Sequence, residues 1–187
     1  PHLPDAGLRG KVALRQIKSA RLGAARIRQS HEEGRVTLSV RPVIQFEEGQ
    51  QRADISWGLA LQDPEGKILC EKIYPAEILS AEIPVEEPRL WWPNGLGEQP
   101  LYTVSVQLRQ NGEILEEQKK RIGLRTLTVR REKDAWGESF AHVVNGVPVF
   151  AMGADYIPED CIYGRLSCER TRALLKDCRD AHFNCVR

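Results

Sequence analysis

The sequence predicts a mainly β protein: an antiparallel β-sandwich of immunoglobulin-like size, followed by an incomplete β-α-β unit. Two observations carry this prediction. Between residues 20 and 126, short segments of alternating apolar and polar residues are separated by turn residues, with no convincing helix among them. After residue 160 a single amphipathic helix lies between two short apolar segments, which is the order of a parallel strand–helix–strand unit.

The first two strands are predicted over residues 22–30 and 35–41, joined by a turn at 32–34. In the second of them apolar and polar residues alternate with a period of two, which indicates one buried face. Pro42 cannot donate a backbone hydrogen bond, so it indicates a sheet edge or a β-bulge at that point.

Five further strands complete the predicted sandwich. They are expected over residues 55–61, 68–74, 78–85, 101–109 and 113–122. Asp63-Pro64-Glu65-Gly66 is a strong turn sequence, and Asn111-Gly112 suits a type I′ hairpin because both residues accept positive φ. Trp57 is the natural core aromatic residue, and no cysteine pair brackets it.

The pattern changes after Thr126. Apolar runs at 140–145 and 147–152 flank Asn145-Gly146, a second hairpin-like turn. Ser167 then suits the N-cap of a helix, with Glu169 in its first turn. An apolar stripe follows at helical spacing, formed by Leu174, Leu175, Cys178 and Ala181. Residues 183–187 return to a strand. Such a unit cannot bury both of its faces alone, so it is expected to belong to a larger sheet or barrel.

Composition and charge exclude several classes of function. The 187 residues carry 27 basic and 26 acidic side chains, interspersed, for a net charge of +1, and no basic stripe of the kind that neutralises phosphates occurs. Nucleic acid is therefore not an expected partner. No apolar run approaches the roughly 18 residues that a membrane span requires, and the first ten residues do not have the layout of a signal peptide.

The five cysteines do not form a metal-binding pattern. Cys70, Cys161, Cys168, Cys178 and Cys185 match neither a CxxC nor a zinc-ribbon spacing. Cys178 is expected on the apolar face of the helix and Cys185 in a buried strand, where a free thiol behaves as a small apolar group. His142 and His182 have no ligand partners at useful spacing. We therefore expect neither a metal nor a cofactor, and free thiols favour a reducing compartment such as the cytoplasm.

Two motifs carry a resemblance to a known family. The first is Leu90-Trp91-Trp92-Pro93-Asn94-Gly95, continuing to Gln99-Pro100-Leu101-Tyr102. The second is Val144-Asn145-Gly146-Val147-Pro148, continuing through Gly153-Ala154-Asp155-Tyr156-Ile157-Pro158-Glu159-Asp160 to Phe183-Asn184-Cys185-Val186-Arg187. Between them lies Ile122-Gly123-Leu124-Arg125. In this order over residues 20–187, the motifs resemble glycoside hydrolase family 2, its β-mannosidase branch in particular.

The resemblance implies a domain layout. Residues 1–19 would be a linker or the tail of an upstream jelly-roll domain, 20–126 the immunoglobulin-like β-sandwich, and 127–187 the truncated start of a catalytic (β/α)8 barrel. The parent enzyme would be a retaining exo-glycosidase that removes terminal β-mannosyl residues from β-linked oligosaccharides or glycosides. Its acid/base and nucleophile glutamates would lie beyond residue 187, because Glu138, Glu159 and Glu169 lack the expected Asn-Glu context. The chain alone is then expected to be inactive.

Three residues are expected on the rim of the active site. Barrel enzymes assemble their sites at the C-terminal ends of their strands. With strands at 147–153 and 183–186, Asp155 and Tyr156 follow the first and Arg187 follows the second. The resemblance implies that Arg187 supports the nucleophilic carboxylate, with an ordinary strand-end salt bridge as the alternative. Asp155 departs from the asparagine usual in the family, and Tyr156 either stacks on a sugar or packs under a loop.

Other interpretations stay open. Trp91 and Trp92 resemble a sugar platform, but a turn anchored by aromatic packing fits them better. Within the family, β-galactosidase or β-glucuronidase specificity is the nearest alternative to β-mannosidase. From a different class, residues 20–125 are compatible with a non-catalytic binding or spacer module, which requires exposed aromatic residues on one sandwich face.

Overall fold

The computed structural model describes residues 7, 12–14, 16–17, 19–46 and 54–187. Most of the predicted linker or jelly-roll tail at 1–19 lies outside these residues. The chain divides into two compact units, Ile17–Phe150 on one side and Pro1–Gln16 with Ala151–Arg187 on the other. Each unit is described by itself below.

Most of the secondary structure is β, as predicted. In chain order the strands are β1 Ala20–Glu32, β2 Arg35–Phe46, β3 Ile55–Gln62, β4 Ile68–Pro75, β5 Ala81–Glu86, β6 Tyr102–Gln110, β7 Glu113–Ile122, β8 Leu127–Arg130, β9 Ala141–Val144, β10 Val147–Val149, β11 Gly153–Ala154 and β12 Cys185–Val186. A 3₁₀ turn, η1 Tyr163–Arg165, and the helix α1 Cys168–Asp180 lie between the last two strands.

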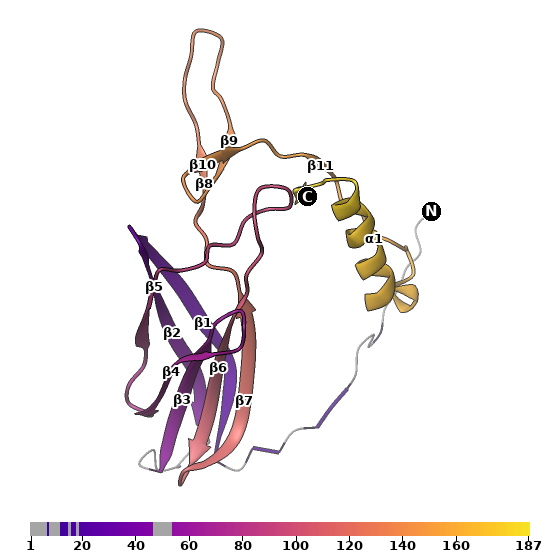
Figure 1. Cartoon of the computed structure of the whole chain (residues 1–187). Coiled ribbons are helices and arrows are strands. Elements are labelled where there is room, and N and C mark those ends of the chain that lie inside the picture. The colour runs from indigo at the N-terminus through magenta and orange to yellow at the C-terminus, as the bar shows by residue number, and fades with distance from the viewer. Residues whose placement is uncertain (1–6, 8–11, 15, 18, 47–53) are drawn as a thin grey trace. The chain divides into compact units, whose positions relative to one another are not determined.

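The first seven strands form two antiparallel sheets (Figure 1), with the orders β1-β2-β5 and β4-β3-β6-β7. Inward-facing residues of both sheets share one apolar core, which confirms the alternation read from the sequence. Trp57 of β3 is fully buried at its centre, donates a hydrogen bond from Nε1 to the carbonyl oxygen of Ile78 (2.8 Å) and stacks on Tyr74. The predicted core tryptophan is therefore confirmed.

Pro42 marks both an edge and a bulge in β2. On one side, β5 pairs only with residues up to Val40, so no described strand lies beside Pro42 there. On the other side, the register with β1 shifts between Gly23 and Arg26. A residue without an N–H is tolerated where the ladder needs no donor, so the proline sits where its chemistry costs least.

Side chains of β7 complete the backbone hydrogen bonding of β1. Glu116 accepts a bond from the amide of Leu22 (2.9 Å), and Gln118 donates to the carbonyl of the same residue (2.9 Å). Lys120 donates to the carbonyl of Ala25 at 2.6 Å, beside the bulge. These bonds join the two sheets along one margin, because backbone groups left without ladder partners must be satisfied otherwise.

Both Asn-Gly turns have the predicted geometry. The φ angles are 50° and 85° at Asn111 and Gly112, and 51° and 80° at Asn145 and Gly146. Positive φ at both central residues matches the right-handed twist of the flanking strands. The second turn connects β9 to β10, which pair antiparallel.

The first strand of the predicted barrel is shorter than expected. Residues 147–153 were predicted as one strand, but Val147–Val149 folds back on β9 as the outer strand of a three-stranded sheet, β10-β9-β8. The Asn145-Gly146 turn causes this, since it returns the chain directly onto its predecessor. Only Gly153 and Ala154 pair in parallel, with Cys185 and Val186 of β12.

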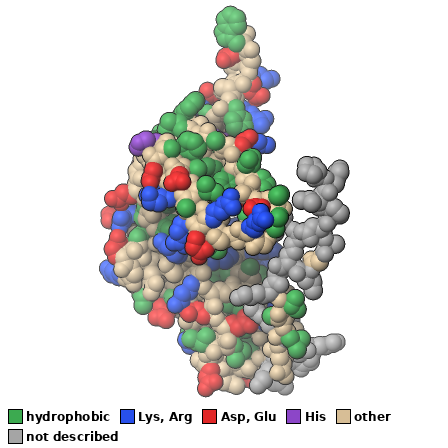
Figure 2. Space-filling model, turned by 90° about the vertical axis from the view of Figure 1, so that its right-hand side faces the viewer, with side chains coloured by type: hydrophobic (Ala, Val, Ile, Leu, Met, Phe, Trp, Pro, Cys, Tyr) green, Lys and Arg blue, Asp and Glu red, His purple; other side chains and the backbone are tan. Residues whose placement is uncertain are grey.

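The β8–β9 connection forms a projecting hairpin arm that the sequence did not predict. Asp134 Oδ1 accepts bonds from the amides of Trp136 (2.7 Å) and Gly137 (2.8 Å), so the tip is a side-chain-stabilised turn. Trp136 is 95% exposed there. Figure 2 shows the arm as a narrow projection with a hydrophobic side chain at its end.

The helix α1 forms as predicted, and its N-cap is Ser167. The Ser167 hydroxyl accepts a bond from the amide of Arg170 (3.2 Å), and Glu169 lies in the first turn. No residue of α1 is buried, and Leu174 and Leu175 of the apolar stripe are exposed. The prediction of a buried strand around Cys185 was wrong, because a two-stranded pair leaves its faces without cover, and this cysteine is exposed.

Candidate functional site

The candidate site lies at the carboxyl ends of β11 and β12. The amide of Arg187 donates to the carbonyl oxygen of Ala154 (3.2 Å), and the amide of Tyr156 donates to the carbonyl oxygen of Arg187 (2.6 Å). These bonds continue the parallel ladder past both strands. Asp155, Tyr156 and Arg187 therefore lie at one end of the pair, which is where the sequence analysis expected them.

Gly153 allows the two strands to approach. A Cβ atom on this residue would lie 1.8 Å from the carbonyl oxygen of Cys185, far inside van der Waals contact. Asn184 fixes the preceding residues, since its Oδ1 accepts a bond from the amide of Met152 (2.9 Å). The backbone at the site thus depends on a glycine and an asparagine.

Asp155 and Arg187 form an exposed ion pair. Arg187 Nη1 lies 3.0 Å from Asp155 Oδ2, and the two side chains are 85% and 62% exposed. An exposed pair of this kind contributes about 0–1 kcal/mol, so it orients the guanidinium without binding it tightly. The arginine retains further N–H donors for a second acceptor.

Tyr156 is half-buried and is held by Glu159. Its hydroxyl donates a hydrogen bond to Glu159 Oε1, and the same oxygen accepts a second bond from Thr171 Oγ1 at 2.6 Å. Thr171 lies in the first turn of α1. The loop after β11 is therefore fastened to the helix through one carboxylate.

Protonation at this cluster follows from its hydrogen bonds. The bond from Thr171, and then that from Tyr156, hold the pKa of Glu159 below its usual value. The bond to Glu159 raises the pKa of the Tyr156 hydroxyl. At neutral pH the carboxylate is charged and the phenol is protonated, whereas a general acid needs a carboxyl with a raised pKa.

Glu159 was not expected to be a catalytic residue, and its hydrogen bonds with Tyr156 and Thr171 were not predicted from the sequence. The sequence contains a signal for these contacts, since Glu159 lies three positions after Tyr156 and a threonine lies in the first turn of the following helix. Glu138 and Glu169, which were also set aside, are both exposed.

The first signature motif forms a compact turn. The amide of Trp92 donates to the carbonyl of Glu98 (2.9 Å), and Gln99 Nε2 donates to the carbonyls of Trp92 (3.1 Å) and Gly97 (2.6 Å). A Cβ atom on Gly97 would lie 2.8 Å from the Trp92 ring. The tryptophan ring therefore packs on the turn.

The other tryptophan of the motif, Trp91, contacts segments that are distant from it in sequence. Trp91 donates from its amide to the carbonyl of Leu124 (2.9 Å), and its ring lies against Gly123 and 4.5 Å from the Arg125 guanidinium. Asn145 Nδ2 donates to the Trp91 carbonyl (3.0 Å), while its Oδ1 accepts from the amide of Thr126 (3.0 Å). The motif residues thus contact one another, with both tryptophans half-buried.

The described residues offer no metal site and no membrane helix. No group of three or more His, Cys, Asp or Glu side chains in the described part of the chain is arranged to hold a metal ion. His142 lies edge-on to Phe140. The one described α-helix is too short and too polar to cross a bilayer.

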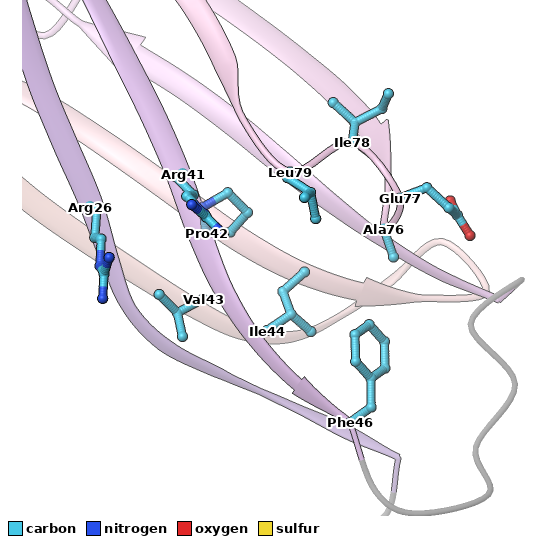
Figure 3. Close-up of a pocket in the computed structure, with 10 residues that line it drawn as sticks. All are labelled: Arg26, Arg41, Pro42, Val43, Ile44, Phe46, Ala76, Glu77, Ile78 and Leu79. Carbon is cyan, nitrogen blue, oxygen red and sulfur yellow. The ribbon is translucent and has the colours of Figure 1, made fainter.

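A separate pocket of about 500 Å³ lies in the Ile17–Phe150 unit (Figure 3). Its walls are mainly apolar and come from β2 and the segment before β5, with Arg26 and Arg41 also lining it. Glu77 is its only carboxylate among the described residues. It contains none of the expected site residues, and one carboxylate does not make the pair that glycoside hydrolysis requires.

Comparison with known proteins identifies the family. The model for glycosyl hydrolases family 2 matches residues 20–125, which include the two sheets and the turn around Trp91 and Trp92. The chain belongs to glycosyl hydrolases family 2. The resemblance inferred from the sequence motifs is thereby confirmed.

Alignments with curated relatives and with a solved structure extend past the sandwich. β-Mannosidase B of Emericella nidulans is 31% identical over 177 residues, and that of Neosartorya fischeri is 35% identical over 178 residues; each alignment covers 92% of this chain and 20% of the relative. The chain thus spans about a fifth of the length of these relatives. The crystal structure of β-D-mannosidase from Dictyoglomus thermophilum matches with a TM-score of 0.78 at 29% identity, over 90% of this chain and 21% of that one.

A solved structure with lower sequence identity shares the fold alone. The β-glucuronidase of Parabacteroides merdae matches with a TM-score of 0.71 but only 14% identity, over 90% of this chain and 21% of that chain. The architecture is therefore common to enzymes whose names state different sugars.

Proposed function

We propose that this chain is part of a retaining exo-β-mannosidase that removes terminal β-mannosyl residues from β-linked oligosaccharides or glycosides. Residues 20–126 are its sandwich and 127–187 the first part of a (β/α)8 catalytic barrel. The observation that carries the proposal is the parallel β11–α1–β12 unit, with Arg187 and Asp155 side by side at its carboxyl end. The β-mannosidase names of the relatives that align over 92% of the chain support the choice of sugar.

In this proposal Arg187 supports a catalytic carboxylate that residues outside this chain supply. A guanidinium favours the charged form of a carboxylate and orients it through paired N–H donors. The pair with Asp155 is exposed and weak, so it presents Arg187 without saturating it. Retaining enzymes place two carboxyl groups about 5–5.5 Å apart, and no described glutamate of this chain stands in the sequence context expected of either.

The experiment has two parts. Incubated with an aryl β-mannoside, the 187-residue chain is expected to release no aglycone, and turnover by the chain alone would overturn the placement of both catalytic glutamates. The longer protein that we propose to contain it is expected to hydrolyse an aryl β-mannoside faster than the matching β-galactoside and β-glucuronide. Preference for either of the other two sugars would replace the β-mannosidase assignment by that specificity.

Arg187 provides a sharper test within the longer protein. Arg187→Lys keeps the positive charge but loses the planar fork of donors, so kcat is expected to fall while the unfolding midpoint stays the same. Arg179→Lys is the matched control, because Arg179 lies in the last turn of α1, where it pairs with the exposed Asp180. Equal activity of the two variants would leave Arg187 as an ordinary strand-end residue.

A binding or spacer module fits the structure less well. That interpretation requires exposed aromatic residues on one sandwich face. Every Phe, Trp and Tyr between residues 20 and 126 that the structure describes is buried or half-buried.

A further inference from the structure

The loop that follows β11 contains a buried carboxylate whose second oxygen has no hydrogen bond. The Glu159 side chain is 6% exposed, and its Oε2 has no hydrogen-bond partner among the described atoms. Its other oxygen accepts from both Tyr156 and Thr171. Burying a charged group with incomplete partners costs free energy, so a carboxylate at this position needs a reason other than stability.

The charged groups around Glu159 restrain it without completing its hydrogen bonds. Arg170 Nη2 donates to the Glu159 carbonyl oxygen (2.9 Å), while Arg170 Nε lies 3.7 Å from Oε2. Arg170 also lies 3.7 Å from Asp160 Oδ2, and Arg165 of η1 lies 4.0 Å from the same oxygen. These contacts connect the loop with η1 and α1. Within the described part of the chain, the hydroxyls of Tyr156 and Thr171 are the two hydrogen-bond donors to the carboxylate.

The hydrogen bond between Tyr156 and Glu159 has only one possible direction while the carboxylate is charged. A carboxylate only accepts, so the phenol must donate. The phenol proton is then donated to Glu159, and the phenol oxygen can only accept further hydrogen bonds, with the Thr171 hydroxyl as its neighbour on one side. A ligand group that meets this oxygen must therefore be a donor, such as a sugar hydroxyl.

We propose that Glu159 is a positioning residue: it fixes the Tyr156 ring beside the Asp155–Arg187 pair and sets the phenol oxygen to accept a hydrogen bond from the substrate. The contact with substrate rests on the proposed glycosidase function, whereas the hydrogen bond between Tyr156 and Glu159 is independent of that function. The backbone already ties the two places together, because the amide of Tyr156 donates to the carbonyl of Arg187. Glu159 fixes the side chain as the ladder fixes the main chain.

The test follows the ionisation of Tyr156 in the 187-residue chain by NMR of ¹³Cζ-labelled tyrosine. The sequence has 4 tyrosines, and loss of one resonance in Tyr156→Phe assigns it. In Glu159→Gln the charged acceptor becomes neutral, so the Tyr156 titration midpoint is expected to fall. In Thr171→Val, a close match in shape, Glu159 Oε1 loses its other donor and Tyr156 loses the Thr171 hydroxyl that lowers its pKa, so the Tyr156 midpoint is expected to rise.

A fall of the Tyr156 midpoint in Glu159→Gln together with a rise in Thr171→Val indicates positioning by Glu159. General loosening of the loop would instead lower the midpoint in both variants, toward the ordinary pKa of tyrosine. Glu169→Gln is the control, because Glu169 is an exposed glutamate in the first turn of α1, the turn that contains Thr171. An unchanged Tyr156 midpoint in folded Glu159→Gln, or a fall in Thr171→Val, overturns the proposal. If Glu159→Gln loses the α1 circular dichroism signal, the direction of the Thr171→Val shift decides alone. No glycoside is turned over in these measurements, so their failure is separate from failure of the proposed function.

Discussion

The sandwich and the β11–α1–β12 unit differ in how completely they bury their own apolar residues. In the sandwich, Leu38, Trp57, Leu61 and Leu108 have no exposed surface. In the other unit α1 has no buried residue, although its apolar stripe and its N-cap are well formed. The comparison teaches that correct local structure does not imply a complete core: an antiparallel sandwich closes with its own strands, whereas a parallel pair needs further strands and helices.

The largest expected effect comes from removing the same side chain in the two regions. Leu108→Ala in β6 creates a cavity in the shared core and is expected to cost about 2–5 kcal/mol of unfolding free energy. Leu175→Ala in α1 removes a side chain that is 45% exposed and is expected to change the sandwich transition by less than about 0.5 kcal/mol. Urea denaturation followed by tryptophan fluorescence, to which the buried Trp57 contributes, measures both. Equal costs would mean that α1 shares the sandwich core.

Gly153→Ala is expected to disrupt the β11–β12 pair and to leave the sandwich intact. The added Cβ would meet the Cys185 carbonyl, and such overpacking costs about 1–3 kcal/mol. The parallel pair is expected to open, which NMR detects as faster amide exchange at Arg187, while the urea midpoint of the sandwich stays the same. Gly164→Ala is the control, since nothing lies within 4 Å of its added Cβ. Retained protection at Arg187 in Gly153→Ala would contradict the close approach of the strands.

The two Asn-Gly turns allow a matched test of the Trp91 junction. Asn145→Asp keeps a residue that tolerates positive φ but loses the donor to the Trp91 carbonyl, at an expected cost of about 1–2 kcal/mol. Asn111→Asp is expected to change the unfolding free energy by less than about 0.5 kcal/mol, because the hydrogen bonds described at Trp91 and Thr126 come from Asn145 and not from Asn111. Thermal unfolding followed by near-ultraviolet circular dichroism compares them, and equal losses would reduce Asn145 to a turn residue.

Much of this architecture is predictable from the sequence, because the deciding interactions are local. The alternation of apolar and polar residues predicted the buried faces of β2 and β3, and the Asn-Gly pairs at Asn111 and Asn145 predicted two turns. The length of the strand after Gly146 was not predictable, since the apolar run at 147–152 has the same composition whether it pairs with a later strand or folds back on the preceding one. The position of Asp155, Tyr156 and Arg187 at the carboxyl ends of β11 and β12 followed from strand order, but the contact of Glu159 with Thr171 depends on a fold between residues twelve apart.

The smallest effect concerns the start of α1. Ser167→Ala removes the acceptor for the Arg170 amide and is expected to cost about 1 kcal/mol of local helix stability. Circular dichroism at 222 nm is expected to fall while the sandwich transition stays unchanged. Ser167→Asp, which retains an N-cap acceptor, is expected to keep the signal. A shift of the sandwich midpoint in Ser167→Ala would show that the two regions unfold together.

Residue-resolved hydrogen exchange of the unmodified chain tests the central claim most directly, namely that the sandwich is self-sufficient and the β11–α1–β12 unit is the open start of a larger sheet. We expect amides of β3 and β6 to exchange only through global unfolding, and amides of α1 and of Arg187 to exchange much faster. Equal protection of α1 and β6 would contradict the account, because the helix would then belong to a core that is already complete.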